Sequence, residues 1–130
     1  MSIIGPSAAY QATYGLFKNA IVLTTPEQVS DVFYGTETCV ILMYWHKCGH
    51  CTSFAPTYDE AAEQYHKKIK LYAIDVEKAE PRGQLPADQF FSDGGVPRVA
   101  AVENGVIKET VKGNDPSKFM ALLKKLVTPV

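Results

Sequence analysis

The chain has 130 residues, of which 46% are hydrophobic and 21% charged, and its formal net charge is -1 at pH 7. This length and composition indicate one soluble globular domain with an ordinary core. The charge gives no support for nucleic acid or an anionic membrane as a partner. No apolar stretch approaches the roughly 20 residues that span a bilayer.

Residues 1–20 are expected to form an extension with a short helix. Good helix formers recur there at roughly helical spacing after the breaker Gly5-Pro6. The domain proper is predicted to be 21–130, without internal repeats or linkers.

That domain is predicted to open with a short strand at 21–23. Thr25 then caps a helix, with Pro26 at its first position and Gln28 completing a capping box. The apolar residues of this helix end near Gly35.

The run 39–44 is apolar throughout, as in a strand buried on both faces of a sheet. A long amphipathic helix follows, with a kink expected at Pro56. The next strand is predicted at 71–76, parallel to 39–44, because strand–helix–strand order implies a crossover connection.

Residues 77–95 are predicted to be irregular apart from a short helix at 87–91. A β-hairpin is predicted from 97–102 and 106–111, since Asn104-Gly105 is a type I′ turn signal. A last helix begins after Asp115-Pro116. The fold class is therefore α/β, a central mixed sheet of about five strands with helices on both faces.

Two cysteines lie between the 39–44 strand and the long helix, in Cys48-Gly49-His50-Cys51. Unpaired N–H groups and the helix dipole at such a position favour a thiolate, which is the nucleophile. One alternative is a metal site drawing on His46, Cys48, His50 and Cys51, although tetrahedral sites usually combine two separated ligand pairs. Another is a purely structural pair.

This arrangement resembles the thioredoxin fold, and the tetrapeptide resembles the catalytic domains of the protein disulfide isomerase family. The resemblance covers roughly residues 20–127. It rests on the dithiol at a helix start, on Pro56, on Val96-Pro97 before the hairpin, and on the closing helix. It implies a cis-proline beside the dithiol.

Two positions depart from that family. Lys47 stands where the family has tryptophan before the first cysteine, and Leu42 stands where it has a buried carboxylate. Leu71 and Ala73 occupy the face from which a lysine would pair with that carboxylate. We therefore expect slow resolution of mixed disulfides, or another proton acceptor for Cys51.

The resemblance implies the site roles. Cys48 is the attacking thiolate and Cys51 the resolving thiol, with Gly49 and His50 as the spacer. Lys47 and, when protonated, His50 or His46 are expected to favour the thiolate, giving a comparatively oxidising pair. Val96 and Pro97 are expected to bind substrate through the backbone.

The other polar residues are interpreted as having no role in the chemistry of the site. Asp75, Glu77 and Glu80 are expected to be solvated strand-end charges, and His66 a solvated helix residue. Arg98 is either a solvated strand-end charge, which is favoured, or a contact for substrate. Cys39 is expected to pack as a small hydrophobe.

The expected function is thiol–disulfide exchange with protein substrates, as in a protein disulfide isomerase, without a cofactor or metal beyond the Cys48–Cys51 pair. The alternatives are a thioredoxin-like reductase and a non-catalytic chaperone-like module. Expected partners are unfolded or thiol-bearing proteins and a redox partner such as glutathione, an oxidase or a reductase. The resemblance implies the endoplasmic reticulum lumen; the absence of a signal peptide in the given sequence leaves the cytoplasm open.

Overall fold

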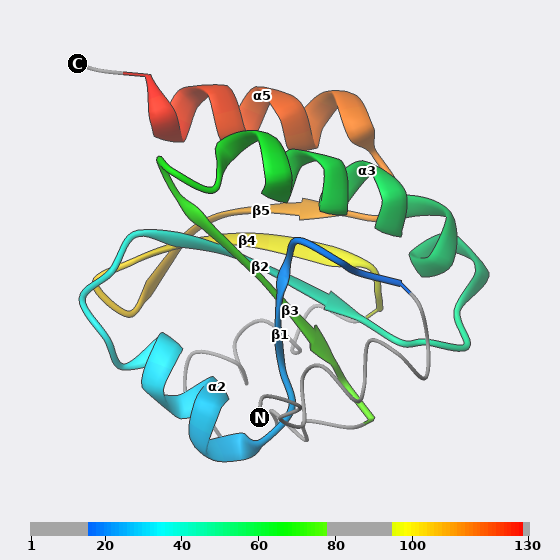
Figure 1. Cartoon of the computed structure of the whole chain (residues 1–130), viewed down its shortest axis with the longest axis horizontal. Coiled ribbons are helices and arrows are strands. Elements are labelled where there is room, and N and C mark those ends of the chain that lie inside the picture. Colours follow the sequence, from blue (N-terminus) through cyan, green and yellow to red (C-terminus); the bar gives the residue numbers. More distant parts are fainter. Residues whose placement is uncertain (1–15, 78–94, 129–130) are drawn as a thin grey trace.

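The computed structural model describes residues 16–77 and 95–128 and contains one five-stranded sheet (Figure 1). The strand order is β1-β3-β2-β4-β5. β1, β3 and β2 run parallel to one another. β4 pairs antiparallel with the other edge of β2, and β5 pairs antiparallel with β4. Their bounds are β1 Ile21–Leu23, β2 Cys39–Tyr44, β3 Lys70–Asp75, β4 Arg98–Glu103 and β5 Val106–Lys112.

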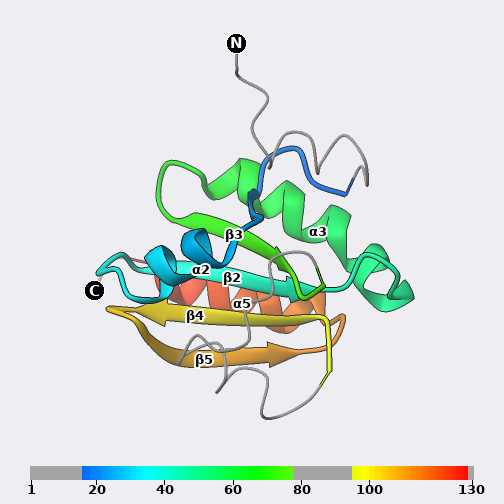
Figure 2. The same ribbon diagram turned by 90° about the horizontal axis from the view of Figure 1, so that it is seen from below.

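The helices cover both faces of this sheet, which confirms the predicted α/β class, a central mixed sheet of five strands between helices. α3 (Gly49–Tyr65) and α5 (Pro116–Val127) lie on one face, and α2 (Pro26–Phe33) lies on the other (Figures 1 and 2). β2 occupies the middle of the sheet and is buried along its whole length.

The alternation of side chains along β2 divides the core in two. Val40, Leu42 and Tyr44 join the cluster under α3 and α5. The intervening residues Cys39, Ile41 and Met43 join the smaller cluster under α2. Successive side chains of a strand point to opposite faces, so an unbroken apolar run is what a middle strand between two helical layers requires.

The predicted helix starts are confirmed. The Thr25 side chain accepts from the Gln28 backbone N–H, and the Gln28 side chain accepts from the Thr25 N–H, closing the capping box. Asp115 caps α5 by accepting from Lys118. α3 continues through Pro56, so this proline does not end the helix.

Residues before β1 pack onto α3. Phe17 is buried, with its ring edge-on to Tyr44 and to Tyr58 at centroid distances of 5.1 and 6.1 Å. The Asp59 carboxylate of α3 accepts from the backbone N–H groups of residues 18, 19 and 20. The last residues before β1 are therefore part of the packed structure.

β1 and β2 match their predicted bounds. β3 begins and ends one residue earlier than predicted, β4 begins and ends one residue later, and β5 ends one residue later. The helix expected within 1–20 and the one expected at 87–91 fall outside the described residues, except for 16–20. Among the helices of the described residues, none is long and apolar enough to cross a membrane.

The predicted hairpin turn is confirmed, with Asn104 at φ 54° and Gly105 at φ 76°. This left-handed conformation is the one a type I′ turn demands. A Cβ on Gly105 would lie 2.6 Å from the Phe33 carbonyl oxygen, so the glycine also lets the hairpin approach the end of α2.

Gly105→Ala and Gly113→Ala form a matched pair. Both glycines have positive φ, but a Cβ on Gly113 meets nothing within 4 Å. We expect Gly113→Ala to cost about 1 kcal/mol of unfolding free energy, from backbone strain alone, and Gly105→Ala about 3 kcal/mol, from strain plus the clash. Urea unfolding measures both, and equal losses would contradict the close approach.

Candidate active site: a dithiol at the start of α3

Cys48 caps the N-terminus of α3. Its backbone is extended (φ -88°, ψ 122°), and its sulfur accepts from the Cys51 backbone N–H at 3.3 Å. The sulfur thus lies at the positive end of the helix dipole, where it takes up one of the amide N–H groups that the first turn of a helix leaves without a partner. Cys48 is partly exposed, whereas Cys51 is 1% exposed. An accessible sulfur and a buried one are arranged as an attacking and a resolving thiol require.

Cys51 is held as a protonated thiol. Burial raises its pKa to about 12, helped by contact with the Cys48 sulfur and by the negative charge of Asp75, while the backbone N–H of Trp45 opposes the rise. Cys51 therefore needs help to become a nucleophile at neutral pH.

The Val96–Pro97 peptide bond is cis and lies beside the dithiol. The Cys48 sulfur is 3.8 Å from the Val96 carbonyl oxygen. Pro97 is buried, and its own carbonyl accepts from the Gly113 N–H at 2.8 Å. Fold and cis bond thus bring together two segments almost 50 residues apart.

The other predicted site residues surround Cys48 on the outside. Lys47, Gly49 and His50 are exposed, and a Cβ on Gly49 would meet nothing within 4 Å. Within the part of the chain that the structure describes, neither the Lys47 nor the His50 side chain forms a hydrogen bond with either sulfur.

Beneath the dithiol the sheet is apolar, as expected. Leu42 and Ala73 are fully buried neighbours in the β2–β3 ladder, so neither half of a buried ion pair is present at these two positions. Losing both partners is tolerable because no charge is left stranded.

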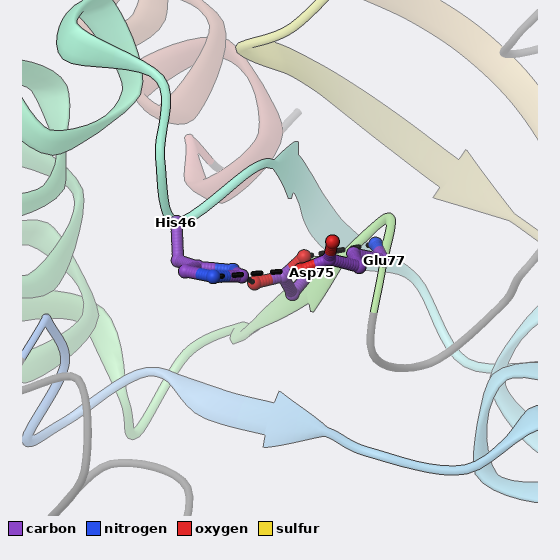
Figure 3. A network of polar contacts seen from close by, with 3 residues as sticks. All are labelled: His46, Asp75 and Glu77. Carbon is purple, nitrogen blue, oxygen red and sulfur yellow. Dashed lines mark hydrogen bonds and ion pairs between the residues drawn. The ribbon is translucent and has the colours of Figure 1, made fainter.

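A buried acid is nevertheless present nearby, and the interpretation of Asp75 as a solvated charge is wrong. Asp75 is 1% exposed. Its carboxylate lies 2.7 Å from Nδ1 of His46 and accepts from the Glu77 backbone N–H at 2.9 Å (Figure 3). Glu77 is exposed as predicted, and its carboxylate lies 3.4 Å from Nε2 of His46.

The sequence carried a signal for this acid. Leu71, Ala73 and Asp75 alternate along β3, so all three belong to the face under α3. Asp75 is the register partner of Tyr44, at the strand end next to the dithiol turn. Its burial depends on that turn folding over it.

The interpretation of Arg98 as solvated is also wrong, since Arg98 is 3% exposed. It begins β4, between Met43 of β2 and Lys112 of β5. A strand that lies between two others has a neighbour along each edge, and Arg98 is buried at the start of such a strand.

The remaining predictions concern Cys39, His66 and a metal. Cys39 is fully buried, and burial raises its pKa to about 12. His66 is exposed. Within residues 16–77 and 95–128, no group of three or more His, Cys, Asp or Glu side chains is arranged to hold a metal ion.

A dithiol at a helix N-terminus, facing a cis X-Pro bond in this sheet, defines a thioredoxin-fold dithiol protein. The thioredoxin family model matches residues 20–125. The chain belongs to the thioredoxin family.

Individual relatives include both thioredoxins and an isomerase. Thioredoxin C-2 of Corynebacterium nephridii is 31% identical over 83 residues, 58% of this chain and 77% of that protein. The chloroplastic M-type thioredoxin of Pisum sativum is 28% identical, over 82% of this chain and 66% of that protein. A Schizosaccharomyces pombe relative whose name places it among the protein disulfide-isomerases is 28% identical, over 95% of this chain and 25% of that protein.

Solved structures agree on the fold. The thioredoxin of Malassezia sympodialis superposes with a TM-score of 0.72 at 23% identity, covering 85% of this chain and 94% of that one.

Alkylation should separate the three thiols. The pKa values of Cys39 and Cys51 are raised from 9.0 to about 12, so roughly a thousandfold less thiolate is present at pH 7 than for an ordinary cysteine. We expect iodoacetamide to modify Cys48 alone in the native reduced protein, and all three in denaturant, as read by peptide mass spectrometry. Cys48→Ser should remain unmodified; native labelling of Cys39 would contradict its burial.

The same pKa values predict alkaline destabilisation of the reduced protein. Between pH 9 and about 12 the unfolded state loses the two thiol protons that the folded state keeps, so the free energy of unfolding falls as pH rises. Urea unfolding at several pH values measures this slope. Cys39→Val should make it shallower, and an unchanged slope would show that Cys39 does not contribute.

Proposed function

We propose that this protein is a thiol–disulfide oxidoreductase that exchanges disulfides with polypeptide substrates through Cys48 and Cys51. The observation that carries the proposal is the asymmetry of the pair. The accessible Cys48 sulfur caps α3, and the buried Cys51 lies one turn inside the same helix.

The exchange has two steps when a substrate disulfide is reduced. The Cys48 thiolate attacks one substrate sulfur, the substrate disulfide breaks, and its other sulfur leaves as a thiolate. Cys51 then loses its proton and attacks the Cys48 sulfur of the mixed disulfide. The Cys48–Cys51 bond forms and the second substrate thiolate leaves. The reverse sequence donates a disulfide to a substrate.

Substrate binding is proposed to use the backbone around Val96. Its carbonyl oxygen lies beside the attacking sulfur, where an extended chain could add as a further strand. Trp45, which is 37% exposed and immediately precedes the dithiol turn, offers an apolar surface at the same edge. Backbone pairing carries little sequence information, so unfolded or extended polypeptides are the proposed substrate class.

For direction, we favour an isomerase-like oxidant because of the Cys-Gly-His-Cys tetrapeptide and the exposed cationic Lys47 beside it. This reading implies a secretory compartment and a partner such as glutathione or an oxidase. The second candidate is a reductase of substrate disulfides whose own Cys48–Cys51 disulfide is reduced again by a partner enzyme. It is supported by the relatives named thioredoxin, which include chloroplast proteins.

The redox potential separates these two directions. Equilibration with glutathione should give a Cys48–Cys51 potential near about -180 mV for an isomerase-like protein and near about -270 mV for a thioredoxin-like reductase. We expect the former, with refolding of scrambled ribonuclease exceeding insulin reduction.

Cys48→Ser is the control for both assays and should abolish them. Ribonuclease refolding that survives this substitution would instead indicate the chaperone-like alternative, a module that acts without the dithiol.

A further inference from the structure

His46 and Asp75 form a nearly buried pair next to the dithiol. The His46 side chain is 9% exposed and the Asp75 side chain 1%, with 2.7 Å between Nδ1 and the carboxylate. His46 belongs to the turn between β2 and α3, whereas Asp75 ends β3. Figure 3 shows the imidazole directed toward Asp75, with Glu77 beyond it.

The turn that holds His46 touches both cysteines. The Trp45 carbonyl accepts from the Cys48 N–H at 2.9 Å. The Trp45 backbone N–H donates to the Cys51 sulfur, which lowers the pKa of that thiol. His46 follows Trp45 directly, so its bond to Asp75 fixes this turn to β3. The adjacent ladder is continuous, because the Val76 N–H donates to the Tyr44 carbonyl at 2.8 Å.

Asp75 is unfavourable for the resolving thiol when its charge is not balanced. Burial is the largest cause of the raised pKa of Cys51, and the negative charge of Asp75 adds to it. Each ring nitrogen of His46 is close to a carboxylate oxygen: Nδ1 lies 2.7 Å from Asp75 and Nε2 lies 3.4 Å from Glu77. A neutral imidazole can donate to one of them and an imidazolium to both. An imidazolium at this position would place a positive charge 2.7 Å from the Asp75 carboxylate and offset its negative charge.

We propose that His46 is a positioning residue for the resolving step, where it neutralises Asp75 and so allows Cys51 to form its thiolate. This inference rests on the proposed exchange reaction. In the step itself, Cys51 gives its proton to solvent and attacks the Cys48 sulfur, and the bond between Cys48 and the substrate breaks with its electron pair on the leaving sulfur. No further oxidant or reductant takes part.

The His46–Asp75 pair lies near Leu42, an apolar residue on the sheet face beneath the dithiol. Leu42 cannot carry charge to Cys51, and Ala73 beside it cannot either. Asp75 lies two residues beyond Ala73 on the same face of β3, so the charge that acts on Cys51 comes from the neighbouring strand and is governed by a turn residue.

Reaction of the reduced protein with 5,5′-dithiobis(2-nitrobenzoate) tests this in two phases. The first thionitrobenzoate is released when Cys48 forms the mixed disulfide, and the second when Cys51 resolves it. Gln at position 46 can still donate a hydrogen bond but carries no charge. We expect His46→Gln to slow the second phase about tenfold, which corresponds to a change of about one unit in the Cys51 pKa.

Removing the opposing charge should reverse this loss. The double variant His46→Gln/Asp75→Asn is expected to resolve within about threefold of the wild-type rate, an outcome that mere loosening of the turn would not produce. His66→Gln, the same change at an exposed position near the end of α3, should leave both phases unaltered.

The proposal is overturned if His46→Gln resolves at the wild-type rate, or if the double variant stays as slow as His46→Gln. The second result would assign Asp75 as the proton acceptor, or the loss to a displaced turn. If His46→Gln does not fold, Asp75→Asn alone decides: its second phase should equal or exceed the wild-type rate, and a slower one refutes the inference. Absence of any first phase in the wild type would instead refute the exchange reaction itself.

Discussion

The site depends on where the middle strand of the sheet stops. β2 is apolar on both faces and cannot continue past Tyr44 without leaving the core, so the chain turns and starts α3 within a few residues. β3 runs parallel to β2 and ends at the same edge, bringing Asp75. β4 runs antiparallel, so its beginning, after Val96 and Pro97, arrives there too. Three segments distant in sequence thus meet around Cys48.

The features that could be predicted from the sequence are those encoded by neighbouring residues. The Thr25 capping box, the Asn104-Gly105 turn and the Cys48 cap each follow from a few adjacent side chains whose geometry is satisfied locally. The unbroken apolar run of β2 predicted its place in the middle of the sheet, since a strand between two helical layers has no polar face. The fold class followed from these signals together with the order of elements.

The features that were missed depend on distant neighbours. Asp75 and Arg98 both stand at a strand end, where charged residues are usually solvated. What buries them is the register of adjacent strands and, for Asp75, the turn that carries His46. The alternation of side chains along β3 shows on which face of the sheet Asp75 lies, but it does not show which residues bury its side chain. Neither the depth of a strand end nor its hydrogen-bond partner can be derived without the strand order.

The outer strands have a bearing on where another polypeptide can join the sheet. β1 is three residues long, and β5 presents Lys108, Glu109 and Lys112 to solvent. Short edges and edge charges are the means by which sheet proteins resist self-association through their rims. If the protein exchanges disulfides with unfolded polypeptides as proposed, it meets extended apolar segments that readily pair with exposed edge strands. The short β1 and the charged β5 would then leave the cis-proline loop, rather than the edges of the sheet, as the place where such a segment pairs.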